Sequence, residues 1–439
     1  MKKLLFVATY FPPVPSGGNA RQLRFLRYLP EFGWEPTVLT FRARGPVPDP
    51  EGVRIIRTLT PGPDGAYALA RRVTAALQAR GHPGAAPPLD APTAAQPPGG
   101  PMTARRTLVD AHVHGSRSQG INLWLFVPDQ YVGWVPPAVL AGVRLARREG
   151  FAAIFSSYPR ASTHLVAAGV AGRTGLPWLA DYRDPWPTHQ YLRYKTALHE
   201  RANVALERWA LARAAAATAV NEPIADDLRR RFPLLAPRVS VIANGFDRAE
   251  VVTDVTLDEG FWFVYTGRLY HRGDKAARFL DALAELPDDI GVVFVGSDDE
   301  RLRTYAASLG IAHRVRTLGY VPHATALGYQ RAASALLLVT GDAPESLSSK
   351  IFEYLQSGRP VFAMTPPTSA AARLLDEIGG GERPAAGGPL AADLATFVAR
   401  VRAGAVRAAD PALLDRYDAR SLTARLARTL DDLSDRSRD

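Results

Sequence analysis

The 439-residue chain contains no cysteine. This absence excludes a disulfide scaffold, a thiolate nucleophile and sites in which cysteine ligates zinc or an iron–sulfur cluster. No run of 18 apolar residues occurs, so we expect no membrane-spanning helix. The nine histidines lack zinc-binding spacings, so we expect no zinc site.

Basic residues outnumber acidic ones, with Lys+Arg 53 against Asp+Glu 43 and a net charge of +10. A basic surface suits phosphates, nucleotides, nucleic acid or an anionic membrane face. The composition is that of a soluble globular protein, and the length predicts two or three domains. The apolar run at Leu4–Ala8 ends before Pro12 without a cleavage pattern, which favours a first buried strand over a signal peptide. We expect a cytosolic protein.

Short apolar runs rich in β-branched residues alternate with longer amphipathic stretches. Such runs are typical of parallel strands that helices cover on both faces. They form two series, which predicts an α/β protein with two doubly wound, Rossmann-like domains. The expected strands are 4–8, 37–41, 53–57, 152–156, 178–181, 218–220 and 239–242 in the first series, and 261–266, 292–296, 315–318, 335–339 and 360–363 in the second.

The boundary between the domains is expected just after the Asn-Gly turn at Asn244–Gly245, because a polar stretch and then a fresh strand follow it. We predict an N-terminal domain over 1–246, a C-terminal domain over 247–420, and a last helix within 421–439 that could cross back to the N-terminal domain. Residues 81–105 are rich in Pro, Gly and Ala, which predicts a flexible excursion from the first domain.

Two glycine-containing loops follow predicted strands. Gly17 and Gly18 stand directly before a helix, where backbone N–H groups can face an anion or a sugar, or can simply form a turn. Gly267 ends the first strand of the second series, and Arg268 follows it. Ligands bind at the carboxyl ends of strands in open α/β sheets, and arginine suits a diphosphate. A surface salt bridge would account for Arg268 equally well.

The segment from Glu345 to Gly358 contains a second candidate cation. Serines at 346, 348 and 349 predict the start of a helix, which places Lys350 and Glu353 on one face. Amides at the helix start and Lys350 can bind an anion, and the flanking carboxylates of Glu345 and Glu353 can accept sugar hydroxyls. A capped helix with an i,i+3 ion pair would explain the same spacing.

Together these motifs resemble the signature of retaining GT-B glycosyltransferases of family 4. The core of the resemblance is Glu345-x7-Glu353 followed by Gly358-x-Pro360-Val361, in a variant typical of members that build bacterial polysaccharides and glycolipids. Further similar segments extend over nearly the whole chain: the N-terminal Pro/Gly-Gly loop, Pro128-Asp129 with Trp134, Gly175–Trp178, Asp181–Pro187, Ile242–Asp247, Tyr265–Arg268 and Gly319–Pro322.

The resemblance implies a GT-B fold, in which two Rossmann-like domains face each other across a cleft. It also implies transfer of a sugar, as in hexosyltransferases, from a nucleotide-diphosphate sugar to a glycan, a lipid-linked sugar or a small molecule. Arg268 and Lys350 would hold the diphosphate, Glu345 the donor sugar and Glu353 the ribose; Glu345, Lys350 and Arg268 are the implied catalytic residues. Further donor-binding positions are Lys275, Arg272, Gly319, Tyr320, Val321, Ser348, Ser349, Gly17 and Gly18. The implied acceptor-binding residues are Asp181, Asp184, Arg183 and Tyr158, although Asp184 before Pro185 could equally be a turn residue.

Two positions depart from the family pattern. Members often carry a lysine five or six residues after the arginine of the Gly-Arg pair, whereas Arg272 and Lys275 lie four and seven residues after Arg268. Many members also carry a histidine where this chain has Ser156–Arg160, and His164 lies further along. We assign no general base, because in the family the departing phosphate is thought to help take the acceptor proton. Family members are usually metal-independent at the diphosphate, so the resemblance implies no metal and no other cofactor.

Other functions remain open. A nucleotide-sugar epimerase of the same fold would need acid/base groups around the cleft. A non-enzymatic basic protein that binds nucleic acid would need a recognisable module, and none is found, so nucleic acid is not an expected partner. The basic amphipathic stretches at 191–209 and around Arg144, Arg147 and Arg148 fit peripheral binding to the inner face of an anionic membrane, or simply a solvated helix face.

Overall fold

The computed structural model describes residues 1–14, 19–59, 102, 105, 126–188, 194, 196–269, 273–297, 299–385 and 387–436. Every strand segment expected from the sequence overlaps a strand in it. The predicted α/β class is confirmed. One short strand, β13 (Gly381–Glu382), was not expected, because two residues give no detectable alternation or apolar run.

The first sheet has seven strands in the order β3-β2-β1-β4-β5-β6-β7. Strand β1 pairs in parallel with β2 and with β4, so that Leu4 lies opposite Pro36 on one side and Ala153 on the other. Leu4 to Val7 are fully buried, as expected for a strand covered on both faces. The strands are β1 (Lys2–Val7), β2 (Trp34–Phe41), β3 (Arg54–Thr58), β4 (Ala153–Ser157), β5 (Trp178–Tyr182), β6 (Ala216–Ala219) and β7 (Val239–Val241).

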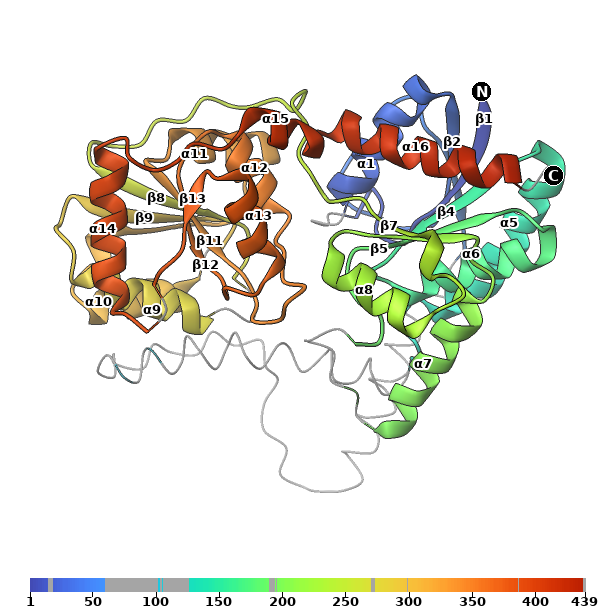
Figure 1. The fold of residues 1–439 in the computed structure, drawn as a ribbon, viewed down its shortest axis with the longest axis horizontal. Coiled ribbons are helices and arrows are strands. Elements are labelled where there is room, and N and C mark those ends of the chain that lie inside the picture. The colour runs from blue at the N-terminus through green and yellow to red at the C-terminus, as the bar shows by residue number, and fades with distance from the viewer. Residues whose placement is uncertain are drawn as a thin grey trace. The chain divides into compact units, whose positions relative to one another are not determined.

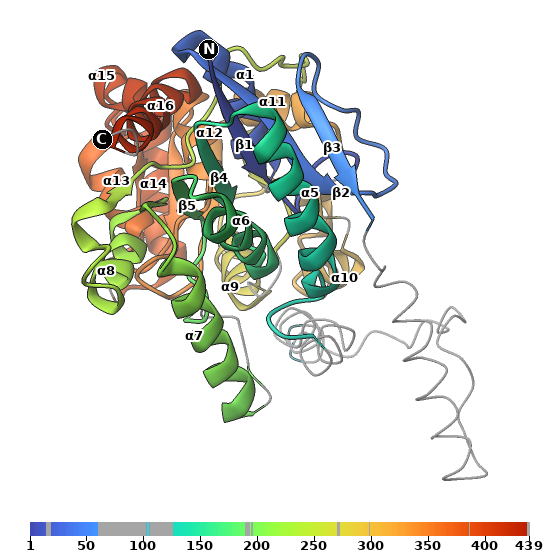
Figure 2. The same ribbon diagram turned by 90° about the vertical axis from the view of Figure 1, so that its right-hand side faces the viewer.

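Helices follow most of these strands and cover the sheet (Figure 1). Helices α5 and α6 lie side by side in both views (Figure 1 and Figure 2). Glycines permit this close packing, because a Cβ on Gly142 would lie 2.6 Å from Val170 and one on Gly169 would lie 2.7 Å from Val139. The helices are α1 (Asn19–Tyr28), α5 (Val135–Glu149), α6 (Ala161–Thr174), α7 (Ala197–Leu211) and α8 (Glu222–Arg231), with 3₁₀ turns at Leu29–Phe32, Val132–Trp134 and Ala236–Arg238.

The second sheet has six parallel strands in the order β10-β9-β8-β11-β12-β13. Its core includes Phe263, Phe279, Phe362 and Phe397, whose rings pack against one another. The strands are β8 (Phe261–Thr266), β9 (Ile290–Val295), β10 (Val315–Leu318), β11 (Ala335–Val339), β12 (Val361–Met364) and β13. The helices are α9 (Gly273–Ala284), α10 (Glu300–Ser308), α11 (His323–Ala332), α12 (Lys350–Gln356), α13 (Ala370–Ile378), α14 (Leu390–Arg402), α15 (Pro411–Leu414) and α16 (Ala419–Arg436), with 3₁₀ turns at Ala312–Arg314 and Asp415–Tyr417.

The chain forms two compact units, and the last helix contributes to both: residues 218–428 belong to the second unit and 429–436 to the first. Within the first unit, Lys2 Nζ donates to Asp431 Oδ1 (2.9 Å) and to Ser434 Oγ (2.8 Å). The predicted domain limits at 246 and 420 stay predictions. The Pro-rich segment 81–105 lies outside the described residues apart from Met102 and Arg105.

Candidate functional site

Lys350, at the start of α12, lies over Gly267 at the carboxyl end of β8. Gly267 has a φ of +97°, and a Cβ at this position would overlap Cε and Nζ of Lys350. The ammonium group also lies 5.3 Å from the centroid of the Tyr265 ring, within cation–π range. Glycine is therefore required at 267 both for its backbone conformation and for the space that Lys350 occupies.

The neighbouring strands β9 and β10 end in glycines as well. Gly296 has a φ of +89°, and a Cβ there would lie 3.2 Å from the Cα of Gly267. The Gly296 N–H donates to the carbonyls of Leu318 (2.9 Å) and Gly319 (3.1 Å). Gly267 and Gly296 thus present bare backbone side by side, with Lys350 directly over Gly267. Tyr320, which follows Gly319, is 85% exposed.

A buried tyrosine fixes α12 against β8. The Tyr354 hydroxyl accepts a hydrogen bond from the Thr266 N–H (2.8 Å) and lies 3.2 Å from Thr266 Oγ1. Gln330 Nε2 on α11 donates to the same Thr266 Oγ1 (3.2 Å). Burial raises the pKa of the Tyr354 hydroxyl, so it remains protonated. Residues 350–356 are therefore locked onto the strand that ends in Gly267 and Arg268.

Three of the predicted site residues carry charges that are not paired with other groups in the described part of the chain. Among the described residues, neither the guanidinium of Arg268 nor the ammonium of Lys350 forms an ion pair, and the side chain of Glu345 has no hydrogen-bond partner. The Glu345 carbonyl accepts a hydrogen bond from Asn221 Nδ2 (2.9 Å), which helps to hold its loop in place. Unpaired cations at the carboxyl end of a parallel strand can bind an anion such as a diphosphate.

The ammonium group of Lys275, unlike that of Lys350, is already paired and so is less available to a ligand. Its Nζ donates to the Thr340 carbonyl (2.8 Å) and to Asp342 Oδ1 (2.6 Å). Of the other predicted donor-binding residues, Ser348 lies in the loop before α12 and Val321 follows Tyr320, whereas Arg272, Gly17 and Gly18 lie outside the described residues. Their roles stay predictions. Ser349 occupies the N-cap position of α12 but forms no side-chain cap, so the expected cap at Ser349 is wrong.

Glu353 belongs to a cluster that the sequence did not reveal. His323 Nε2 lies 3.2 Å from Glu250 Oε2 and 3.9 Å from Glu353 Oε1. One ligand atom from each of the three residues lies within 4.8 Å of the other two, and these residue types can bind a metal ion. Glu353 is 12% exposed and Glu250 is 19% exposed. Glu250 is far from His323 and Glu353 in sequence, and no motif links it to them.

Two of the predicted acceptor-binding residues are buried in the first unit. The Asp181 carboxylate, which is 0% exposed, pairs with Arg21 (2.8 Å) and accepts a hydrogen bond from Ser157 Oγ (2.7 Å). Tyr158 is buried and stacks on Tyr182. Arg183 and Asp184 follow β5 and are half-buried. The geometry gives Asp181 a role in holding α1 to β5, and direct contact of these four residues with an acceptor stays a prediction.

His164, on α6, is fully buried and uncharged. Trp178 Nε1 donates to Ser156 Oγ (2.8 Å), which lies 2.8 Å from His164 Nδ1. The serine hydroxyl thus accepts from Trp178 and shares a hydrogen bond with the His164 ring, while His164 Nε2 is buried without a partner among the described residues. Burial lowers the pKa of His164 to about 3, against an opposing influence of Asp181. This histidine is part of the core.

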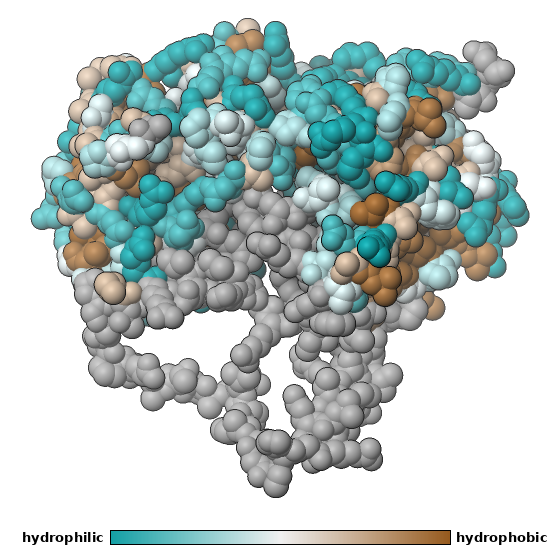
Figure 3. Space-filling model, turned by 60° about the horizontal axis from the view of Figure 1, so that its bottom comes forward, coloured by the Kyte–Doolittle hydropathy of each residue, from teal (hydrophilic) through white to brown (hydrophobic). Residues whose placement is uncertain are grey.

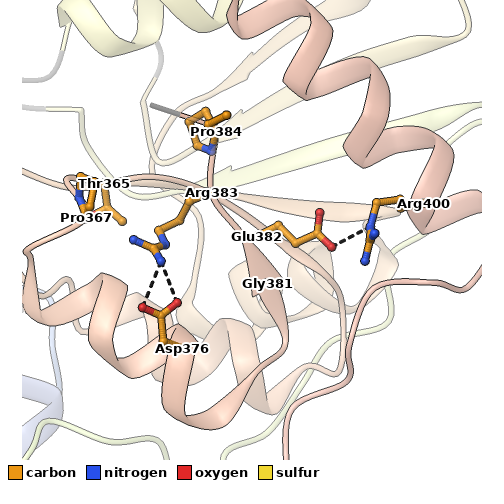
Figure 4. Close-up of a pocket in the computed structure, with 9 residues that line it drawn as sticks. Thr365, Pro367, Asp376, Gly381, Glu382, Arg383, Pro384 and Arg400 are labelled. Atoms are coloured by element: carbon orange, nitrogen blue, oxygen red, sulfur yellow. Dashed lines mark hydrogen bonds and ion pairs between the residues drawn. The ribbon is translucent and has the colours of Figure 1, made fainter. Parts of the chain in front are cut away.

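A cavity of about 750 Å³ lies beside β13 (Figure 4). Its charged side chains are paired with each other: Arg383 with Asp376 (2.7 Å), and Arg400 with Glu382 (2.9 Å). Since these charges are already balanced, the cavity offers no unpaired group to bind a charged ligand. The strand end at Gly267 is the better candidate site.

Two family models match the sequence, one in each half of the chain. The model described as Glycosyltransferase Family 4 matches residues 94–250, and the model described as Glycosyl transferases group 1 matches residues 260–387. No curated protein matches the sequence significantly.

Solved structures share the fold over almost the full length. The structure of HepE from Anabaena in complex with UDP and glucose is 17% identical, with a TM-score of 0.63 over 98% of this chain and 100% of that chain. Sucrose-phosphate synthase from Thermosynechococcus elongatus is 15% identical, with a TM-score of 0.60 over 99% of this chain and 95% of that chain. A putative UDP-N-acetylglucosamine 2-epimerase from Listeria monocytogenes is 10% identical, with a TM-score of 0.52 over 97% of this chain and 95% of that chain.

The two parallel sheets with interleaved helices and these structural neighbours define an α/β protein of the GT-B fold. With the two family matches, the chain belongs to the family 4-like GT-B glycosyltransferases. The resemblance inferred from the sequence is confirmed at this level.

Proposed function

We propose that the protein is a retaining hexosyltransferase that uses a nucleotide-diphosphate sugar and transfers the sugar to a glycan, a lipid-linked sugar or a small molecule. The observation that carries the proposal is that Arg268 and Lys350, at the bare strand end formed by Gly267 and Gly296, form no ion pair with any described residue. The structure of HepE with UDP and glucose, a protein of the same fold, supports the choice of donor class.

In this proposal the diphosphate lies between Lys350 and Arg268. Both cations stabilise the negative charge that develops on the leaving phosphate, and the fixed position of Lys350 avoids reorganisation of this cation during the reaction. Lys350 is well suited because Tyr265 and Gly267 confine its stem. The Glu345 carboxylate, which has no partner among the described residues, accepts hydroxyls of the donor sugar.

The acceptor proton passes to the departing phosphate rather than to a side chain. His164 does not serve as a base, because it is fully buried in the core and burial lowers its pKa to about 3. Catalysis then depends mainly on positioning of the acceptor hydroxyl and on charge stabilisation. A retained anomeric configuration in the product, read by NMR of the anomeric proton, supports this course; an inverted product contradicts it.

A thermal-shift panel tests the donor class. UDP, GDP, ADP and TDP sugars are added to the protein in separate experiments. A ligand at 100 times its Kd stabilises the folded state by about 2.7 kcal/mol, which raises the melting temperature measurably. Stabilisation by one nucleotide series but not by the free sugars supports the proposal. If no nucleotide shifts the transition, the proposed donor class is wrong.

An epimerase is the second candidate, because the putative epimerase from Listeria monocytogenes shares the fold. The two reactions differ in their products. A transferase releases a nucleoside diphosphate and requires an acceptor, whereas an epimerase returns an altered nucleotide sugar without an acceptor. Chromatography of a nucleotide sugar incubated with the protein alone distinguishes them.

We further propose that α7 lies against an anionic membrane surface on the cytoplasmic side. No helix in the described part of the chain is both long and apolar enough to span a bilayer. On α7, Leu198 is 74% exposed and Trp209 is 42% exposed, and Arg201 and Arg208 are also exposed on this helix. Apolar and hydrophilic residues lie intermixed on the face that Figure 3 presents. Interfacial helices combine these residue types.

Co-sedimentation with liposomes tests the membrane proposal. The protein should bind vesicles that contain anionic lipid at low salt, and it should be released at high salt because the attraction is screened. The Leu198→Ser/Trp209→Ser double variant should bind more weakly, whereas Leu234→Ser, at a 91% exposed leucine elsewhere, should not. Absence of binding at low salt removes the proposal.

A further inference from the structure

His323 places its Nε2 between two carboxylates, at 3.2 Å from Glu250 Oε2 and 3.9 Å from Glu353 Oε1. A carboxylate can only accept a hydrogen bond, so the contact with Glu250 requires a proton on Nε2. The same N–H edge faces Glu353. Two carboxylates this close repel each other when both are ionised, and the imidazole N–H offsets that repulsion.

Glu250 is held in place by its backbone. The Asp247 side chain accepts from the Ala249 N–H (2.9 Å), and the Glu250 N–H donates to the Asp247 carbonyl (3.2 Å), which makes a tight turn. Beyond it, the Thr253 N–H donates to the carbonyl of Ala324, the residue after His323 (3.1 Å).

A glycine allows this chain segment to approach α11. A Cβ on Gly328 would overlap the carbonyl oxygen of Thr253, so the segment that follows Glu250 crosses the helix only because position 328 has no side chain. Glu250 is therefore anchored against the start of α11, where its carboxylate contacts His323, which in turn lies 3.9 Å from Glu353.

We infer that His323 and Glu250 are positioning residues that orient the Glu353 carboxylate toward the vicinal hydroxyls of a ribonucleoside. This inference rests on the proposed function. Glu353 lies three residues after Lys350 on α12, on the same face of the helix as the proposed diphosphate-binding cation. A carboxylate held in one orientation accepts one hydrogen bond on each oxygen from two adjacent hydroxyls, and the site thereby discriminates ribose from 2′-deoxyribose.

Calorimetric titration of UDP, GDP and ADP, each beside its 2′-deoxy counterpart, tests the inference. The wild-type protein should prefer the ribonucleotide by about tenfold or more, since a hydrogen bond to a charged group is lost with the 2′-hydroxyl. His323→Phe keeps a planar ring but removes the donor, and Glu250→Ala removes its anchor. Both should weaken ribonucleotide binding and leave deoxynucleotide binding unchanged, so that the preference falls to about twofold or less.

Two further variants sharpen the result. His323→Gln restores an N–H donor and should recover part of the preference. His313→Phe is the matched control, because His313 is an exposed histidine whose Nε2 lies 3.8 Å from Asp288 in the same unit. It should keep the full preference. The deoxynucleotide affinity reports in each variant that the protein is folded and that the diphosphate is still bound.

The outcomes separate the inference from the function on which it rests. If the wild-type protein binds no nucleotide, both are wrong. If it binds with a ribose preference that His323→Phe and Glu250→Ala leave intact, the inference alone is overturned. Because Glu250, His323 and Glu353 are residue types that can bind a metal ion, the titrations are repeated with EDTA. If EDTA abolishes the ribose preference of the wild-type protein, a metal ion rather than the imidazole bridges the two carboxylates. The inference is then also overturned.

Discussion

The ammonium group of Lys350 occupies the space that a side chain on Gly267 would fill. The Gly267→Ala variant should therefore displace Lys350 and should also suffer the strain of a φ near +97°, about 1–2 kcal/mol. We expect glycosyl transfer to fall by roughly 10²–10³, as for the loss of one preorganised charge partner.

Gly310→Ala is the matched control for this change. Gly310 has a φ of +77° but no atom within 4 Å of its Cβ position, so the variant bears the backbone strain without any displaced cation. It should lose similar stability in urea unfolding and keep its turnover. Equal losses of turnover in the two variants would show that strain alone is responsible.

Removal of either proposed phosphate-binding cation should lower kcat strongly and change the free energy of unfolding little. Lys350→Met keeps the aliphatic stem but loses the charge, and Arg268→Ala removes an exposed side chain that has no ion pair within the described residues. We expect kcat to fall by about 10²–10³ in each. Arg278→Ala, at an exposed cation on α9, serves as the control and should retain full activity. A folded Lys350→Met protein with normal kcat contradicts the assignment.

Tyr354→Phe should destabilise the second unit. The change leaves the buried Thr266 N–H without its acceptor, which costs about 1–3 kcal/mol. Urea unfolding monitored by circular dichroism measures the loss. Tyr320→Phe, at an 85% exposed tyrosine, should leave the free energy of unfolding unchanged. A Tyr354→Phe protein of wild-type stability would mean that water or a rearranged side chain satisfies the amide.

His164 should make the fold sensitive to acid. Its pKa is about 3 in the folded protein and about 6.5 when unfolded, so the unfolded state binds more protons below pH 6.5. Stability is then lost progressively as the pH falls from about 6.5 toward 3, by roughly 2 kcal/mol at pH 5.

The His164→Gln variant should lack this component of the pH dependence. Urea unfolding between pH 7 and pH 5 compares the slopes of stability against pH, so any constant cost of the substitution cancels. His313→Gln, at an exposed histidine, should retain the wild-type slope. Parallel curves for wild type and His164→Gln would rule out His164 as the source.

The sequence predicted the strands well because buried parallel strands are marked by local apolar runs, as at Phe261–Thr266. It also singled out Gly267, Arg268 and Lys350 as candidates, because their spacing from strand and helix ends is local information, and the structure brings Lys350 onto Gly267. It could not predict which groups are paired. Arg21 and Asp181 lie 160 positions apart, and their buried ion pair exists only because α1 packs beside β5.

The same limitation applies to Glu250 and His323. Glu250 lies in the polar stretch between the two series of strands, and no local pattern connects that stretch to α11. Their contact depends on the missing side chain of Gly328, a glycine inside a helix that would otherwise be read as a weak position. Tertiary contacts of this kind decide whether a charged residue is available for a ligand, and they are not encoded in spacing.

The hydrogen bond between Tyr354 and Thr266 has a consequence for ligand length. Lys350 and Glu353 lie on one short helix, and that helix is bonded through a single hydroxyl to the strand that ends in Arg268. In the proposed site the separation between the ribose-binding Glu353 and the phosphate-binding Lys350 and Arg268 is therefore fixed. An analogue lengthened by one methylene between ribose and phosphate could bind Glu353 or the two cations, and not both.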